Sequence, residues 1–358
     1  MKIALAALLL QAATAQTAPP IDAQAVDALV EKSAFSGDIR IADAQGGGWS
    51  RVGPLPQPAR GDEDGATWRW ASVTKQVVAV LVMQEVVAGR VELDRPIAAY
   101  LPGFRSANAA TVTVRQLLQH RSGLPNPDDS PVGTGGFPSY YQPGYAGSRD
   151  PLTGYCAGPV KGAPGGDWSY NNCDYLVLGA LLEAVTGTPW AALVEQRIAR
   201  PLKIDFLAAY PGERFTRIGM IEGKPEPAID LASYGAAAGL YGSVDALAKF
   251  DLALMDGTLL PKDALAVLWK GDPALGYMAL GQWAFEAPLK GCDKPVRIIE
   301  RRGGVGGVEV RNFILPEIGR AVIAFSDRAP FDFGEVWQGS GFSHDLLSAA
   351  ACGKRVGE

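Results

Sequence analysis

A serine and a lysine three positions apart are the first residues in this chain that could carry out catalysis. Ser72 and Lys75 stand at the start of an apolar stretch, residues 77–87, which ends at Gly89 and is typical of a long helix. Because residues three apart on a helix share one face, the Lys75 amine can reach the Ser72 hydroxyl. A lysine in a partly dry pocket can lose its proton and act as the base that activates a serine. The pair therefore predicts acyl transfer through Ser72.

This spacing alone is weak support, because it occurs by chance about once in a chain of this length. A second polar group stands at Tyr170 and Asn172, directly before an apolar helix that we predict over residues 175–185, ending at Gly187. The Tyr170 phenol can relay protons if nearby cations lower its pKa. Asn172 can hold Lys75 or a substrate amide. The alternative is that these residues only cap the helix.

Other catalytic arrangements have less support. The run Ser343-His344-Asp345 contains the residue types of a triad, but adjacent residues on a helix point in different directions. His120 is a further candidate base for a Ser-His-Asp triad. The sequence contains no Gly-x-Ser-x-Gly motif, which argues against an α/β-hydrolase.

Four cysteines indicate an oxidising compartment. They allow three disulfide pairings, of which we favour Cys156 with Cys173 and Cys292 with Cys352. A zinc site is the competing interpretation, but the cysteine spacings do not fit one and the chain has only two histidines. We therefore expect no metal and no cofactor.

The N-terminus has the pattern of a secretory signal. Lys2 is followed by a short apolar run, residues 3–10, and Ala13-Thr14-Ala15 supplies small residues for cleavage before Gln16. A native N-terminal helix is the alternative, and the run is too short to span a bilayer. We predict a secreted or periplasmic protein after cleavage. The predicted organisation is a signal peptide over residues 1–15, a linker over 16–23, one hydrolase domain over 24–350 and a C-terminal tail over 351–358.

Composition limits the partners. Apolar residues make up 47% of the chain and charged residues 20%, which is ordinary for a globular protein. The formal net charge of −5 and the lack of a basic patch argue against nucleic acid. No later stretch approaches the roughly 20 apolar residues that a membrane helix needs. A small molecule or a peptide is the expected substrate.

The predicted elements place strands at both ends of the chain and helices between them. Residues 35–44 alternate as a strand, with Ile39 and Ile41 turned inward and Asp38 and Arg40 turned outward. The other expected strands are residues 49–52, 296–300, 308–315 and 321–325, and the other expected helices are residues 21–32, 112–118, 247–255 and 342–350. This order predicts an α+β fold in which both chain ends form one antiparallel sheet around an inserted helical lobe.

A long stretch between Pro125 and Asp167 is rich in Gly, Pro, Ser and Tyr. Long loops inside a compact domain are often functional. A tolerated surface excursion is an equally good interpretation, so the sequence leaves the two open.

Together these motifs resemble the serine β-lactamase and penicillin-binding-protein superfamily, above all the branch of class C β-lactamases, D-alanyl-D-alanine carboxypeptidases and related esterases. The similarity extends over residues 24–350 and is carried by Phe35-Ser36-Gly37, Ala71 to Gln76, Tyr100 to Phe104, Leu117 to Leu124, Tyr170 to Gly187 and Ala238 to Ser243. The resemblance implies a mixed α/β, transpeptidase-like fold in which Ser72 is acylated. It also implies that Lys75 and Tyr170 share proton transfer, that Asn172 positions substrate and that His120 is structural.

The family's third motif is a Lys or His, any residue, and Gly on a core strand. Aligned on the glycine, Arg301-Arg302-Gly303 occupies it here, which departs from the family because Arg301 replaces the Lys or His. A shift of one residue would place Arg302 there instead. A guanidinium can bind a substrate carboxylate through two hydrogen bonds, but it does not deprotonate. By resemblance, the oxyanion hole combines the N–H of Ser72 with one from this strand, expected from Gly304.

These observations predict an exported serine hydrolase that cleaves small esters or amides through an acyl-enzyme on Ser72. A peptidase for D-amino-acid peptides, a β-lactamase and an esterase remain alternatives for the substrate. The substituted third motif also leaves open a catalytically silent protein that uses the same fold to bind a peptide or wall fragment.

Overall fold

The computed structural model describes residues 18–53, 67–133, 136–204, 207–210 and 217–353. The predicted signal peptide, residues 1–15, lies outside the described residues. Among the described residues, no single helix is long and apolar enough to cross a membrane; one pair of helices, residues 172–186 and 190–199, reaches that length and composition only together and is bent by 76°.

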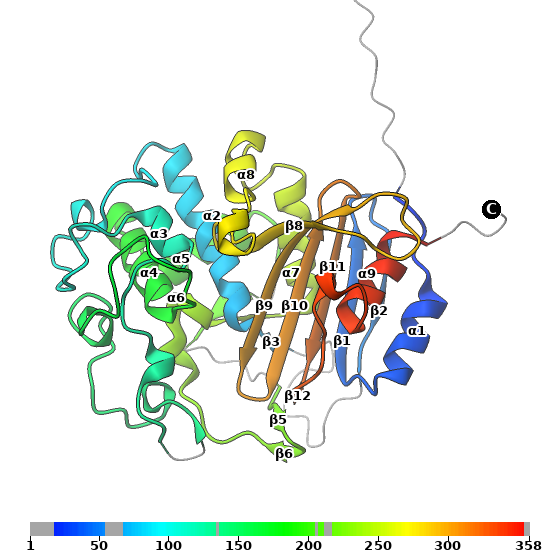
Figure 1. The fold of residues 1–358 in the computed structure, drawn as a ribbon, viewed down its shortest axis with the longest axis horizontal. Coiled ribbons are helices and arrows are strands. Elements are labelled where there is room, and N and C mark those ends of the chain that lie inside the picture. Colours follow the sequence, from blue (N-terminus) through cyan, green and yellow to red (C-terminus); the bar gives the residue numbers. More distant parts are fainter. Residues whose placement is uncertain (1–17, 54–66, 134–135, 205–206, 211–216, 354–358) are drawn as a thin grey trace, which may run out of the picture.

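A six-stranded antiparallel sheet forms the centre of the molecule (Figure 1). The strands stand in the order β2 (Gly48–Arg51), β1 (Gly37–Asp43), β11 (Arg320–Ser326), β10 (Val308–Leu315), β9 (Val296–Val305) and β8 (Trp283–Ala287). The N-terminal strand β1 pairs along its whole length with β11, where Gly37 faces Ser326 and Asp43 faces Arg320. The predicted antiparallel sheet formed by both chain ends is therefore confirmed.

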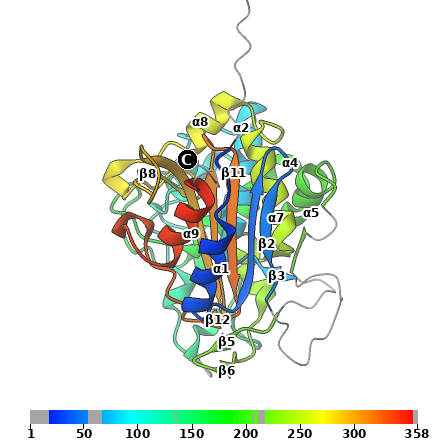
Figure 2. The same ribbon diagram turned by 90° about the vertical axis from the view of Figure 1, so that its right-hand side faces the viewer.

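Helices cover both faces of this sheet. Helices α1 (Ala23–Lys32) and α9 (Phe342–Ala351) lie side by side on one face (Figure 2), where they share an apolar cluster with inward residues of the sheet such as Ile39 and Ile41. The disulfide between Cys292 and Cys352 ties the end of α9 to the β8–β9 connection. On the other face, α7 (Val244–Met255) packs against β1 and β11.

The inserted lobe lies beyond that second face and is mostly helical (Figure 1). It contains α2 (Thr74–Val87), α3 (Val114–Leu118), α4 (Asn172–Thr186), α5 (Trp190–Val194), α6 (Gly235–Ala238) and α8 (Lys262–Leu268). Two small sheets complete the fold: β3 (Trp68–Arg69), β7 (Leu240–Gly242) and β4 (Leu207–Ala209) form one, and β12 (Arg328–Ala329), β5 (Met220–Ile221) and β6 (Lys224–Pro225) form the other.

The orientation predicted for Asp38 is wrong. Its side chain is buried and accepts hydrogen bonds from Nε1 of Trp68 at 2.7 Å and from the backbone N of Gly53 at 3.0 Å. The alternation of residues 35–44 was correct for Ile39 and Ile41. Because α7 packs against β1 on this face, however, Asp38 does not meet solvent, and its carboxylate needs buried donors.

The stretch between Pro125 and Asp167 contains short 3₁₀ turns at Pro127–Asp129, Ser139–Tyr141 and Tyr155–Ala157. A disulfide joins Cys156 in the last of these turns to Cys173 in the first turn of α4. Both predicted disulfide pairings are thus confirmed. Among the described residues, no group of His, Cys, Asp and Glu side chains is arranged to hold a metal ion.

Candidate active site

Ser72 lies in a 3₁₀ turn, Ala71–Val73, that runs directly into α2. Residues three apart along continuous helical turns share one face, and the amine of Lys75, in the first turn of α2, accordingly lies 3.1 Å from the Ser72 hydroxyl oxygen. Ala71 has a left-handed backbone with φ of 45°, a conformation that costs free energy for a residue with a Cβ. The turn thus places the nucleophile and the lysine together at a strained position.

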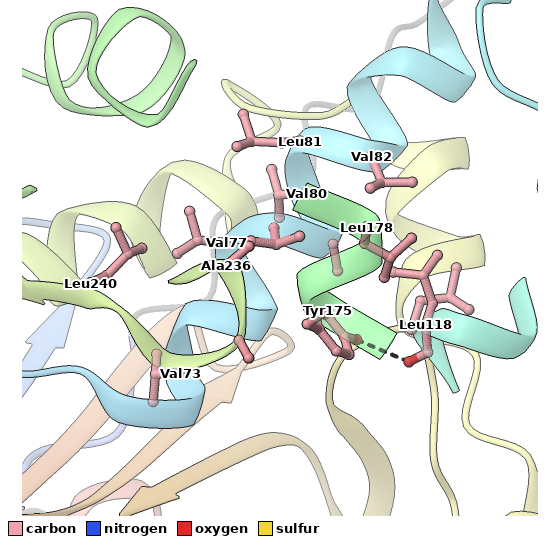
Figure 3. Packing of buried hydrophobic residues seen from close by; sticks show 14 of the residues in the cluster. Val73, Val77, Val80, Leu81, Val82, Leu118, Tyr175, Leu178, Ala236 and Leu240 are labelled. Atoms are coloured by element: carbon pink, nitrogen blue, oxygen red, sulfur yellow. Dashed lines mark hydrogen bonds between the residues drawn. The ribbon is translucent and has the colours of Figure 1, made fainter. Parts of the chain in front are cut away.

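The first turns of α2 are buried on all sides, which removes Lys75 from solvent completely. Figure 3 shows apolar side chains of this helix, such as Val77 and Val80, together with those of neighbouring elements, such as Leu178 of α4. Tyr175 of α4 also faces it, and its hydroxyl donates to the carbonyl oxygen of Leu118 at 2.9 Å. A helix that is apolar all round belongs in a core, and here it carries the lysine into that core.

Tyr170 completes a triangle with these two residues. Its hydroxyl oxygen lies 2.5 Å from Oγ of Ser72 and 2.6 Å from Nζ of Lys75. The next residue, Asn171, caps α4 by accepting a hydrogen bond from the backbone N of Cys173. The sequence prediction began this helix three residues too late, because Asn172 already belongs to its first turn. The cap and the catalytic candidates are therefore neighbouring residues with separate tasks.

Four oxygen atoms surround Nζ of Lys75. Besides the hydroxyls of Ser72 and Tyr170, they are Oδ1 of Asn172 at 2.6 Å and the carbonyl oxygen of Ala237 at 2.9 Å. The last two atoms can only accept hydrogen bonds, so they take both N–H bonds of a neutral amine. The lone pair of that amine then faces the two hydroxyls, which is the arrangement needed to receive a proton.

The electrostatics favour the same protonation state. Burial lowers the pKa of the Lys75 amine well below its ordinary value, and the positive charge of Arg301 lowers it further. Asp128 and Asp174 act in the opposite direction and are outweighed. Burial also raises the pKa of the Tyr170 phenol despite the nearby Arg301 charge, so Tyr170 is a neutral phenol at neutral pH. The lowered pKa that we attached to a relay through Tyr170 is therefore not found; as a neutral phenol, Tyr170 can still pass a proton on by accepting one from Ser72 while it donates its own to Lys75.

Asn172 is held by two residues that sequence reasoning missed. Its Nδ2 atom donates to Oδ1 of Asp128 at 3.0 Å and to the Tyr141 hydroxyl at 2.8 Å, and this turns Oδ1 toward Lys75. Tyr141 in turn donates to the same Asp128 oxygen at 2.7 Å. Both residues come from the Gly- and Pro-rich stretch, whose functional interpretation was one of two left open. The unusual composition of this stretch, interpreted as a functional loop, is the sequence signal that could have indicated Asp128 and Tyr141.

The structure distinguishes the two arginines of the third motif. Arg301 is 1% exposed, and its Nε donates to the carbonyl oxygen of Ser72 at 2.9 Å. Arg302 points to the other side of β9, where it forms salt bridges with Glu300 at 3.0 Å and Glu335 at 2.6 Å. Because side chains alternate along a strand, only one of the two can face the nucleophile, and it is Arg301.

Gly303 lies two residues after Arg301 on β9 and packs against the turn that contains Ser72. A Cβ at this position would stand 2.7 Å from the backbone N of Ser72 and 3.0 Å from the Cβ of Ala71, so only glycine fits. Gly304 is exposed, and a Cβ there would meet no atom closer than 3.9 Å. The strand thus approaches Ser72 closely at Gly303 and leaves open space at Gly304.

The two histidines are not part of the triangle. His120 is buried beneath Tyr170 with ring centroids 4.8 Å apart, and its Nδ1 accepts a hydrogen bond from the backbone N of Asn171 at 3.3 Å. His344 lies on α9, on the opposite face of the sheet, and its ring contacts Asp345. Nδ1 of His120 also lies 3.2 Å from Oδ2 of Asp174, but among the described residues neither histidine is hydrogen-bonded to Ser72, so no Ser-His-Asp triad forms at the nucleophile.

Comparison with known proteins identifies the family. The protein-family model described as Beta-lactamase matches residues 31–338 of this chain. Esterase EstB of Burkholderia gladioli is 34% identical over 206 residues, covering 53% of this chain and 49% of EstB. Penicillin-binding protein 4 of Amycolatopsis lactamdurans is 33% identical over 237 residues, covering 60% of this chain and 58% of that protein. The chain thus spans only about half of the length of the curated relatives it matches.

Solved structures show the same fold. A D-stereospecific amidohydrolase from Streptomyces sp. superposes with a TM-score of 0.71 at 22% identity, covering 94% of this chain and 100% of that chain. The mixed α/β, transpeptidase-like fold implied by the sequence motifs is confirmed. Since the family model matches most of the chain, the protein belongs to the beta-lactamase family of serine hydrolases.

Proposed function

We propose that this protein is an exported serine hydrolase that cleaves small esters or amides through an acyl-enzyme on Ser72. The observation that carries the proposal is the triangle of Ser72, Lys75 and Tyr170, with heavy-atom distances of 2.5, 2.6 and 3.1 Å. A buried amine with a lowered pKa beside a serine hydroxyl is the arrangement that activates a nucleophile.

The chemistry follows from this geometry. Oγ of Ser72 attacks the carbonyl carbon while its proton passes to the Lys75 amine, directly or through the Tyr170 hydroxyl. The negative oxygen that forms is stabilised by the N–H groups of Ser72 and Gly304. When the bond to the leaving group breaks, the proton returns from Lys75 to the leaving oxygen or nitrogen. Water then hydrolyses the ester on Ser72, with the same amine as base.

Relatives support the substrate class. One is named an esterase, one a penicillin-binding protein, and a solved neighbour a D-stereospecific amidohydrolase. All three names involve an acyl group bonded to oxygen or nitrogen, and we therefore propose esters and amides of small acids, including D-amino-acid derivatives and β-lactams. The two disulfides support export, because they form and persist in oxidising compartments.

A substrate panel tests the proposal. Wild-type protein and Lys75→Ala are assayed with p-nitrophenyl esters, nitrocefin, D-amino-acid amides and D-Ala-D-Ala peptides. Turnover of at least one class by the wild type, lost in Lys75→Ala, is expected. If the wild type turned over none of them and gave no covalent adduct, the protein would be a binding protein of this fold.

A further inference from the structure

Arg301 is a guanidinium buried beside the nucleophile without an anion to balance it. Its side chain is 1% exposed, and among the described residues it takes part in no salt bridge, whereas Arg302 pairs with two carboxylates. Its Nη1 atom has no hydrogen-bond partner among the described residues. Burying an unpaired charge is costly, so the neighbours of this guanidinium must explain its presence.

Its neighbours hold it in one place. Nε donates to the carbonyl oxygen of Ser72, in the turn that contains the strained Ala71. The guanidinium carbon lies 5.7 Å from the ring centroid of Tyr170 and 5.4 Å from that of Trp283, distances at which aromatic rings stabilise a cation. Because these contacts surround the guanidinium and Arg301 is only 1% exposed, a substrate carboxylate has no access to it.

We propose that Arg301 is a positioning residue that fixes the Ser72 turn and directs its buried charge at Lys75, and that it does not bind a substrate carboxylate. This inference rests on the proposed function and narrows it. The site accepts esters and amides that lack a carboxylate. An accessible Lys, His or Arg in the third motif would instead bind such a group on the substrate.

Of the charges in the described part of the chain that act on the Lys75 amine, that of Arg301 has the largest effect. The titratable and charged groups that face the amine from the packed elements are Asp128, Asp174, Tyr170, Tyr175, His120 and Arg301. Burial keeps the two tyrosines and His120 neutral, which leaves the two carboxylates against Arg301. Burial likewise raises the pKa of Asp174 well above its ordinary value. Arg301 is therefore the main charge that keeps the amine deprotonated.

The experiment compares wild type with Arg301→Gln, Arg301→Lys and the control Arg302→Gln, which removes a cation that faces away from Ser72. Acylation by a fluorophosphonate, hydrolysis of neutral p-nitrophenyl acetate and hydrolysis of carboxylate-bearing nitrocefin are each measured from pH 5 to pH 10. Thermal unfolding of every variant shows that it is folded. If Arg301→Gln does not fold, the pH profile of Arg301→Lys, which keeps a charge but loses the Nε bond, is compared with that of wild type.

For Arg301→Gln, we expect the rising limb of acylation to move to higher pH by about one unit, as is typical for loss of a single nearby charge. Both substrates should lose rate by the same factor, in kcat rather than KM, and Arg301→Lys should restore much of the wild-type profile. A loss confined to the KM of the carboxylate substrate, with an unmoved limb, would overturn the inference in favour of a carboxylate clamp. Absence of any wild-type adduct would instead contradict the proposed function and this inference together.

Discussion

The side-chain oxygen of Asn172 lies 2.6 Å from the amine of Lys75, and Asp128 and Tyr141 fix the amide in that orientation. An amide oxygen takes a hydrogen bond from the amine without adding a negative charge. The lysine is therefore held by a neutral group, which leaves its pKa low.

Replacing this amide by a carboxylate tests the point. Asn172→Asp places a negative charge on the amine and raises the pKa of Lys75, so acylation at neutral pH should fall by about tenfold or more. The rising limb of the pH–rate profile should move to higher pH, since the base form is populated only above the new pKa. Asn172→Ala is the control, because it removes the contact without adding charge. An unmoved limb in Asn172→Asp would show that Lys75 is not the base.

The close approach of β9 to the nucleophile predicts a different outcome at each of two adjacent glycines. A Cβ on Gly303 would press on the backbone N of Ser72, whereas a Cβ on Gly304 has room. Gly303→Ala should displace an oxyanion donor and lower the acylation rate by about a hundredfold. Gly304→Ala keeps its N–H and should lose far less. Equal losses in the two variants would exclude this geometry.

His120 supports Tyr170 from beneath. Its backbone oxygen accepts from the N of Ser169, and its Nδ1 accepts from the N of Asn171, so it holds the residues on both sides of Tyr170. Its φ of 58° is tolerated by asparagine, whose Oδ1 can replace Nδ1 as the acceptor. We expect His120→Asn to keep most of the kcat and His120→Leu to lose about tenfold or more, because leucine leaves the buried N–H of Asn171 without an acceptor and Oδ2 of Asp174 without its partner. Similar kcat values for both variants, at equal stability, would show that this hydrogen bond does not position Tyr170.

The two disulfides should separate stability from activity. Each bridge is removed separately by replacing its two cysteines with serine. The free energy of unfolding should fall by about 3 kcal/mol without Cys156–Cys173, which closes 17 residues, and by about 4 kcal/mol without Cys292–Cys352, which closes 60. Only the first bridge holds the stretch that carries Asp128 and Tyr141. Its removal should therefore lower the acylation rate more, although it lowers the free energy of unfolding less. Denaturant titration and fluorophosphonate labelling of both variants give the two quantities.

Much of this arrangement was accessible from the sequence, because hydrophobic periodicity records which residues face the core. The strands at both chain ends, the helix after Ser72 and both cysteine pairs were predicted. Strand β8 was missed, since Trp283–Ala287 is short and lacks a clear alternation. Asp38 was turned the wrong way because a single strand does not reveal that helices cover both faces of its sheet.

The residues of the candidate site likewise fall into those that the sequence predicts and those that only the fold reveals. Ser72, Lys75, Tyr170 and Asn172 carry local motifs, and the structure brings their polar atoms into contact. Asp128, Tyr141 and the carbonyl of Ala237 reach Lys75 or Asn172 only through chain folding, from segments without a motif. The burial of Arg301 is a property of the packed molecule, and no spacing in the sequence distinguishes a buried guanidinium from an exposed one.

The most direct test of Ser72 as the nucleophile is the intact mass of the protein after exposure to a fluorophosphonate. Wild-type protein is predicted to gain the mass of one phosphonyl group, and Ser72→Ala, which keeps the fold, is predicted to gain none. A wild-type protein that gained no mass, or a Ser72→Ala protein that gained the same mass, would contradict the account.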